Sequence, residues 1–182
     1  MQQLLDVSWR IIREKGTDAL TLGHLAEEAG VTKPVVYDHF GTRNGLLVAL
    51  YEAFDRRQTT IIDESLAGSG PTLDEKAGVI ASSYVDCVLT QGREIPDVLA
   101  ALAGSPELEA TKRTYLAAFM EKCRQALAPF VINRTLSTAS LWAMLGAAEA
   151  LSKAAVTDEI TPKQAKDELL RLIVAMAGSD RR

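Results

Sequence analysis

Apolar residues recur along most of the chain at the three- and four-residue spacing of an amphipathic helix. No stretch alternates apolar and polar positions over the length of a strand. Glycine, proline and threonine interrupt the pattern where one helix ends and the next begins. We therefore expect an all-α protein. The pattern predicts about nine helices, at about 3–15, 22–29, 33–40, 43–66, 72–91, 95–103, 105–128, 136–156 and 162–177.

Two expected helix starts carry a capping box, in which a threonine is followed three residues later by a glutamate or glutamine. Thr72 with Glu75 forms one pair, and Thr161 with Gln164 forms the other. Each pair satisfies backbone N–H groups that a helix leaves unbonded in its first turn.

The segment from Thr21 to Phe40 reads as two short helices separated by Gly30-Val31-Thr32. So short a turn imposes a steep angle between the helices, and glycine supplies the left-handed backbone that ends the first. The expected inward residues are Leu25, Ala26, Ala29, Val31, Val36 and Phe40. The second helix then presents a polar and aromatic outer face, which fits a DNA major groove better than a core.

The chemistry of this outer face suggests how it would contact DNA. Lys33 can donate to guanine or phosphate, Val35 can touch thymine methyl groups, and Tyr37 can hydrogen-bond phosphate. A threonine or an arginine at a helix N-terminus adds a donor where anions are already attracted. The candidate DNA-binding residues are Thr21, Thr32, Lys33, Pro34, Val35, Tyr37, His39 and Arg43.

Residues 4–50 resemble the DNA-binding domain of TetR-family transcriptional regulators. The positions that carry the resemblance are Thr21, Leu25, Ala26, Ala29, Gly30, Val31, Tyr37, His39, Phe40 and Leu46. The resemblance implies that Thr21, Lys33, Tyr37, His39 and Arg43 contact DNA, mostly at phosphates. Arg43 stands where the family usually has lysine. Two further departures are the Asn44-Gly45 pair, which replaces acidic residues and should weaken capping, and Gly23, which removes a frequent DNA contact.

The charge distribution gives no support to DNA binding. The net charge is −4, with −1 over residues 1–58 and −3 over the remainder. Phosphate binding must therefore come from a few placed cations and helix N-termini. The longest apolar run, 141–148, is too short to span a membrane, and the N-terminus lacks a signal-peptide pattern. We expect a cytoplasmic protein with reduced, buried Cys87 and Cys123, no metal site and no cofactor.

The remaining chain, 47–182, is expected to form a helical effector-binding and dimerisation domain behind a DNA-binding domain at 1–46. The resemblance implies homodimerisation through the last two helices, about 136–177, whose wide apolar faces fit that role. A small apolar or amphipathic effector would lie among the preceding helices. Candidate lining residues are Tyr84, Cys87, Tyr115, Phe119, Met120 and Met144. Residues of these types at helical spacing also suit an ordinary core.

These features predict a sequence-specific DNA-binding transcriptional regulator. We expect a repressor that binds double-stranded DNA at a near-palindromic operator and is released by a small molecule. One alternative is a regulator of the same fold that is constitutive or controlled by a protein partner, which a filled body core would favour. The other is a small helical enzyme. The chain has no His/Cys/carboxylate cluster, phosphate loop or nucleophile elbow, so we expect a protein without enzyme activity.

Overall fold

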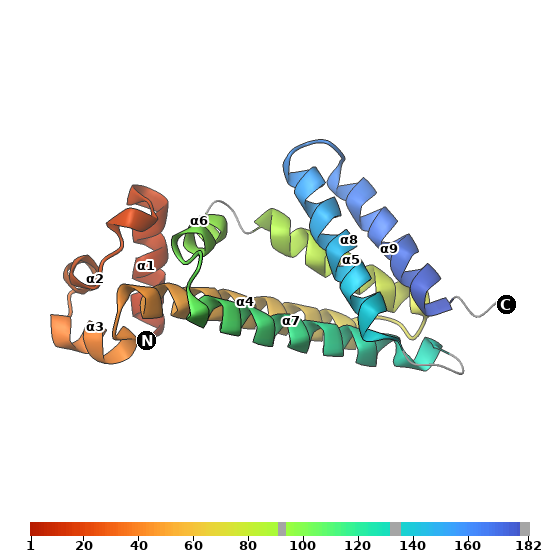
Figure 1. Ribbon diagram of the computed structural model, residues 1–182, viewed down its shortest axis with the longest axis horizontal. Coiled ribbons are helices and arrows are strands. Elements are labelled where there is room, and N and C mark those ends of the chain that lie inside the picture. The colour runs from red at the N-terminus through yellow and green to blue at the C-terminus, as the bar shows by residue number, and fades with distance from the viewer. Residues whose placement is uncertain (91–93, 132–135, 179–182) are drawn as a thin grey trace. The chain divides into compact units, whose positions relative to one another are not determined.

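The computed structural model describes residues 1–90, 94–131 and 136–178. Within these ranges the regular structure is entirely helical, which confirms the all-α prediction (Figure 1). None of the helices within them is both long and apolar enough to cross a membrane. The elements are α1 (Gln2–Lys15), the 3-10 turn η1 (Thr17–Ala19), α2 (Leu22–Ala29), α3 (Lys33–Phe40), α4 (Arg43–Gly68), α5 (Leu73–Thr90), α6 (Glu94–Ala101), α7 (Pro106–Leu127), the 3-10 turn η2 (Ala128–Phe130), α8 (Thr138–Val156) and α9 (Pro162–Gly178).

The chain divides into two compact units, and each is built from segments distant in sequence. Unit 1 comprises Met1–Arg57 and Gln91–Thr114, and unit 2 comprises Gln58–Thr90 and Tyr115–Arg182. The helices α4 and α7 each contribute residues to both units. The functional division expected after residue 46 remains a prediction.

The core of unit 1 is formed by the inward faces of α1 to α4 together with α6 and the start of α7. In α1, Leu4, Leu5, Ile11 and Ile12 lie on one buried stripe, and Gly16 ends the helix with a φ of +80°. Later residues complete the same core: Val98, Leu102 and Leu108. The described part of segment 91–114 therefore packs with the N-terminal helices.

The core of unit 2 lies among α5, α8 and α9, with the second half of α7 against them. Figure 1 shows α8 and α9 as an antiparallel pair beside α5, and all three helices contact one another. Small residues in these helices permit close packing: Ala77, Ala81, Ala148, Ala155 and Ala165. Cys123 of α7 is fully buried here, and this burial raises the pKa of its thiol to about 12.

Candidate nucleic-acid interface

A tight left-handed turn joins α2 to α3. Gly30 has φ +66° and ψ +30°, and the Val31 N–H donates to the Ala26 carbonyl oxygen at 3.0 Å. Beyond the turn, Val36 and Phe40 of α3 are buried against the core of unit 1. Two apolar side chains four residues apart therefore hold one face of α3 in place.

The opposite face of α3 contributes almost nothing to the core. Val35 is 41% exposed and Tyr37 is 52% exposed. Lys33, Pro34 and His39 are also exposed. Six of the eight residues of this helix are exposed, so its outer side chains are free to contact another molecule.

The two threonines that precede α2 and α3 differ in how their hydroxyls are used. Thr21 has extended backbone, and its Oγ1 accepts the His24 N–H at 3.1 Å, which satisfies one N–H group of the first turn. Thr32 also has extended backbone but makes no side-chain capping bond, so its hydroxyl is available to a ligand. Both helix starts belong to unit 1.

Gly23 lies beside the side chain of Lys33. A Cβ atom placed on Gly23 would lie 3.8 Å from Cε and 3.9 Å from Nζ of Lys33. These are ordinary contact distances, so a small side chain would fit there. The glycine therefore leaves the Lys33 ammonium uncovered on the side that faces α2.

A group of charged side chains joins α1 to α2. Glu28 accepts from the Lys15 ammonium at 3.1 Å and lies 3.6 Å from the Arg10 guanidinium. His24 contributes its Nε2, 3.2 Å from the same Lys15 ammonium. The hydrogen bond from Lys15 is the main cause that holds the pKa of the Glu28 carboxyl below its ordinary value. Because the Lys15 ammonium contacts both Glu28 and His24, it links α1 to α2.

Arg43, the first residue of α4, uses its guanidinium inside unit 1. Its Nε donates to the Leu20 carbonyl oxygen at 2.8 Å, and its Nη2 donates to the Thr17 carbonyl oxygen at 2.7 Å. The carboxylate of Asp18 lies 3.8 Å from the same Nη2. The phosphate contact expected for Arg43 remains a prediction, and two N–H groups of this side chain are already bonded to backbone oxygens.

The connection between α3 and α4 is a γ-turn centred on Gly41. This residue has φ +66° and ψ −58°, and the Thr42 N–H donates to the Phe40 carbonyl oxygen at 2.7 Å. Gly45 lies directly against this turn, because a Cβ atom on it would be 2.1 Å from the Phe40 oxygen. The Thr42 hydroxyl accepts the Gly45 N–H at 3.0 Å, so α4 is capped without an acidic residue.

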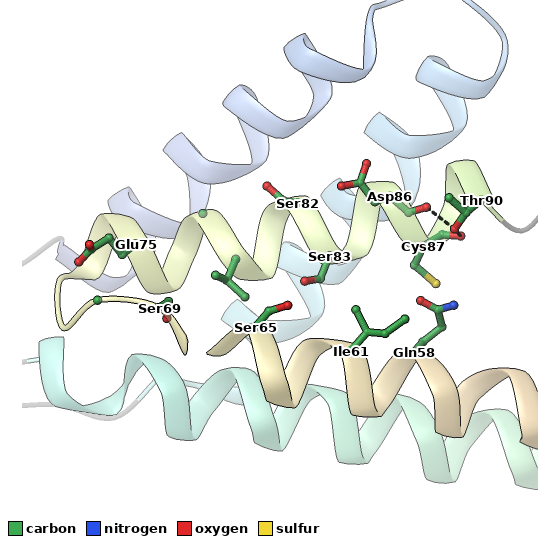
Figure 2. Close-up of a pocket in the computed structure, with 13 residues that line it drawn as sticks. Gln58, Ile61, Ser65, Ser69, Glu75, Ser82, Ser83, Asp86, Cys87 and Thr90 are labelled. Atoms are coloured by element: carbon green, nitrogen blue, oxygen red, sulfur yellow. Dashed lines mark hydrogen bonds between the residues drawn. The ribbon is translucent and has the colours of Figure 1, made fainter. Parts of the chain in front are cut away.

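Unit 2 contains a groove of about 630 Å³ between the C-terminal half of α4 and α5. Figure 2 shows Gln58, Ile61 and Ser65 of α4 pointing toward Ser83 and Cys87 of α5. Two carboxylates also line the groove, and both have partners. Glu75 accepts the Thr72 N–H at 3.1 Å in the expected capping box, and Asp86 pairs with Lys166 at 2.6 Å.

Of the six candidate effector-binding residues, Cys87 lines this groove. Met120 and Met144 are buried in the core of unit 2. Tyr84 and Phe119 pack on that core with ring centroids 5.7 Å apart. Tyr115 is half-buried on α7 and lies outside the lining of the groove. Polar residues at the groove, such as Ser65 and Ser83, had no signal in the sequence because serine is common on helix surfaces.

The helices expected to form the dimer interface keep large apolar side chains exposed. Trp142 is 52% exposed and Val156 is 54% exposed, both on α8. The inward face of the same helix is closed by Leu141, Met144 and Leu145. The single chain thus leaves part of the apolar surface of α8 exposed to solvent.

Comparison with known proteins places the N-terminal part of the chain in a sequence family. Residues 4–50 match the family model described as bacterial regulatory proteins of the tetR family. The HTH-type transcriptional regulator AcrR of Shigella flexneri is 35% identical over 51 residues, which are 28% of this chain and 24% of AcrR. The match thus spans about a quarter of that relative's length.

Solved structures share the fold over nearly the whole chain. A TetR-family regulator from Rhodococcus sp. is similar with a TM-score of 0.69 at 23% identity, covering 97% of this chain and 100% of that one. The FadR regulator of Bacillus subtilis, solved with stearoyl-CoA, has a TM-score of 0.71 at 17% identity, with 96% and 98% covered. The multidrug binding protein EbrR, solved with ethidium, has a TM-score of 0.68 at 18% identity, with 94% and 96% covered.

Proposed function

We propose that the chain, whose residues 4–50 match the family model of tetR-type bacterial regulatory proteins, represses transcription by binding a near-palindromic operator through α3. The observation that carries this proposal is the exposed outer face of α3. A helix of eight residues, fixed by a tight turn and two buried anchors, presents the rest of its side chains outward. A DNA major groove accepts a single α-helix of this kind.

The proposed contacts divide by chemistry. Lys33 and Val35 would reach base edges, because an ammonium donates to guanine and a branched apolar group fits a thymine methyl. Tyr37, His39 and Thr21 would bind phosphates. Further contacts at the start of α3 would come from its cap and first turn: Thr32 and Pro34. The uncovered position of Lys33 beside Gly23 supports its role in base readout.

We propose that two copies of the chain associate through α8 and α9. The exposed Trp142 and Val156 support this assignment, because uncovered apolar area favours association. A two-fold dimer would present two copies of α3 to half-sites about one helical turn apart.

For the effector, we propose a small amphipathic molecule bound in the groove between α4 and α5. Its lining mixes apolar Ile61 and Val79 with hydroxyls and an amide, and it contains no lysine or arginine. A neutral or cationic molecule suits this lining better than an anion, since the lining offers an anion no basic side chain and the Glu75 carboxylate adds a negative charge. Among proteins of the same fold, EbrR binds ethidium, which is a cation.

A second candidate is a regulator of the same fold that uses no small molecule. The close packing of Tyr84, Phe119, Met120 and Met144 in the core of unit 2 favours it, because these side chains leave the expected interior site filled. The two candidates differ only in what releases the protein from DNA.

Selection of bound sequences from random duplex DNA tests the main proposal. We expect enrichment of an inverted repeat, and Lys33→Ala should lower the affinity for it about tenfold or more. Lys112→Ala is the matched control, because Lys112 lies on α7, outside α3 and the helices proposed to form the dimer, and its side chain is 38% exposed. If no sequence is enriched by the folded protein at low salt, the proposal fails.

The effector is tested by titrating the protein–DNA complex with neutral, cationic and anionic amphiphiles. We expect neutral and cationic amphiphiles to release the protein from DNA. The Ser83→Leu variant should no longer be released, because leucine would fill the groove. Thr60→Leu, on an exposed position of α4 outside the groove, should respond like the unmodified protein. Release by none of the classes supports the second candidate.

A further inference from the structure

We propose that Arg43 is a positioning residue, which fixes the start of α2 through two backbone carbonyls and does not act as a phosphate contact. This inference rests on the proposed DNA-binding function. The resemblance to the family implies that a basic residue at this position contacts a phosphate. In this structure the guanidinium instead donates hydrogen bonds to two backbone carbonyl oxygens.

The geometry is that of a two-pronged clamp. The Nε and Nη2 atoms form one edge of the guanidinium, and they donate to the carbonyl oxygens of Leu20 and Thr17 at 2.8 and 2.7 Å. Planar, parallel donors of this kind impose both distance and direction, and hydrogen bonds from a charged group are the stronger ones. A lysine has a single point of charge at the end of a flexible stem, so it cannot span both oxygens with the same fixed geometry.

The clamp acts on a segment that is itself well packed. The Leu20 side chain is fully buried, Thr17 is 8% exposed, and the Arg43 side chain is only 33% exposed. The carboxylate of Asp18, 3.8 Å from Nη2, is itself fully exposed, so water screens its attraction for the guanidinium. The clamp therefore rests on the two hydrogen bonds to backbone oxygens.

What the clamp fixes is the first turn of α2. Leu20 is followed directly by Thr21, whose hydroxyl caps α2 by accepting the His24 N–H. The extended backbone of Thr21 depends on where the Leu20 peptide is held. Since Arg43 is the first residue of α4, it ties the start of α4 to the start of α2 and so orients the Thr21 hydroxyl toward DNA.

The salt dependence of operator binding separates positioning from phosphate contact. We expect Arg43→Lys and Arg43→Gln each to weaken binding about tenfold at fixed salt, since each loses the two-pronged clamp. We also expect both variants to keep the slope of log affinity against log salt concentration. A phosphate contact would behave differently: Arg43→Lys would bind within about twofold of the unmodified protein, and Arg43→Gln would lower the slope by about two for a dimer. That pattern would overturn the inference.

A double-mutant cycle measures whether two substitutions affect operator binding independently. A general loss of stability would not produce a coupling between one particular pair of residues. If Arg43 acts through Thr21, the losses from Arg43→Lys and Thr21→Ala are less than additive. Arg43→Lys combined with Lys33→Ala, on α3, should be additive. Additive losses in both pairs would contradict the inference.

If the Arg43 variants fail to fold, the unmodified protein still tests the clamp. The Nε proton of Arg43 should exchange with solvent slowly by NMR and keep its chemical shift when operator DNA is added. Arg13, which is exposed on α1, provides the fast-exchanging comparison. Fast exchange at Arg43, or a large shift on DNA binding, would overturn the inference. Absence of any operator would instead defeat the proposed function and leave the Arg43 exchange result intact.

Discussion

Replacement by alanine should stabilise the protein at one of two buried helical serines but not at the other. Ser8 on α1 and Ser152 on α8 are both fully buried. The Ser8 hydroxyl donates to the Leu4 carbonyl oxygen at 2.7 Å, whereas the Ser152 hydroxyl is buried without a hydrogen-bond partner. Replacement by alanine therefore removes a satisfied group in one case and an unsatisfied one in the other.

The expected changes in the free energy of unfolding follow from the typical free energies of hydrogen bonding and helix propensity. A buried hydroxyl without a partner costs about 1–3 kcal/mol, and alanine exceeds serine in helix propensity by about 0.5 kcal/mol. We expect Ser152→Ala to raise the free energy of unfolding by about 1.5–3.5 kcal/mol, the combined size of these two terms. Ser8→Ala loses a hydrogen bond of about 1 kcal/mol and regains about 0.5 kcal/mol in propensity, so it should be neutral or slightly destabilising.

The assay is equilibrium unfolding in urea, with the protein concentration fixed because the proposed dimerisation would add to the apparent stability. Ser152→Ala should move the midpoint to higher urea with an unchanged slope, and Ser8→Ala should move it slightly lower or not at all. If Ser152→Ala is no more stable than the unmodified protein, the hydroxyl is satisfied in solution and the reasoning fails.

Three further predictions concern a turn, a thiol and a surface. Gly45→Ala should destabilise unit 1 by about 2 kcal/mol or more in thermal unfolding, because its Cβ would collide with the Phe40 oxygen, whereas Asn44→Ala should have little effect. Cys123, with a pKa raised to about 12, should resist alkylation at pH 8 until the protein unfolds. Its contribution to stability is complete below pH 9.0 and should decline as the pH rises toward 12, a decline absent in Cys123→Ala. Trp142→Glu should weaken dimerisation at least tenfold by analytical ultracentrifugation without unfolding the protomer, since Trp142 is 52% exposed; an unchanged dimer would contradict the assignment of α8.

The helix boundaries could be predicted because their signals are local. The bounds of α2 and α3 agree with the sequence prediction residue for residue, since Thr21, Gly30 and Thr32 act on neighbouring backbone. Both expected capping boxes are confirmed: Glu75 accepts the Thr72 N–H, and Gln164 accepts the Thr161 N–H at 2.8 Å.

Contacts between residues far apart in the sequence could not be predicted in the same way. Val98 and Leu102 read as apolar positions of a helix, but nothing in their spacing indicates that they pack with the N-terminal helices. The partners of Arg43 lie 23 and 26 residues earlier in the chain, and they are backbone carbonyls, which carry no side-chain signal. The sequence predicted a DNA contact at Arg43 from its place in a motif, whereas the bonding partners of its side chain depend on the folded structure.

The residues of α3 that anchor the helix in the core differ from those that it exposes to solvent. Val36 and Phe40 fix the helix, while Lys33, Val35 and Tyr37 project from it and bear little of the folding free energy. The outer positions can therefore be randomised together without redesigning the scaffold. If α3 contacts the operator as proposed, a library confined to this one short helix should yield new operator preferences while the stability of the fold is maintained.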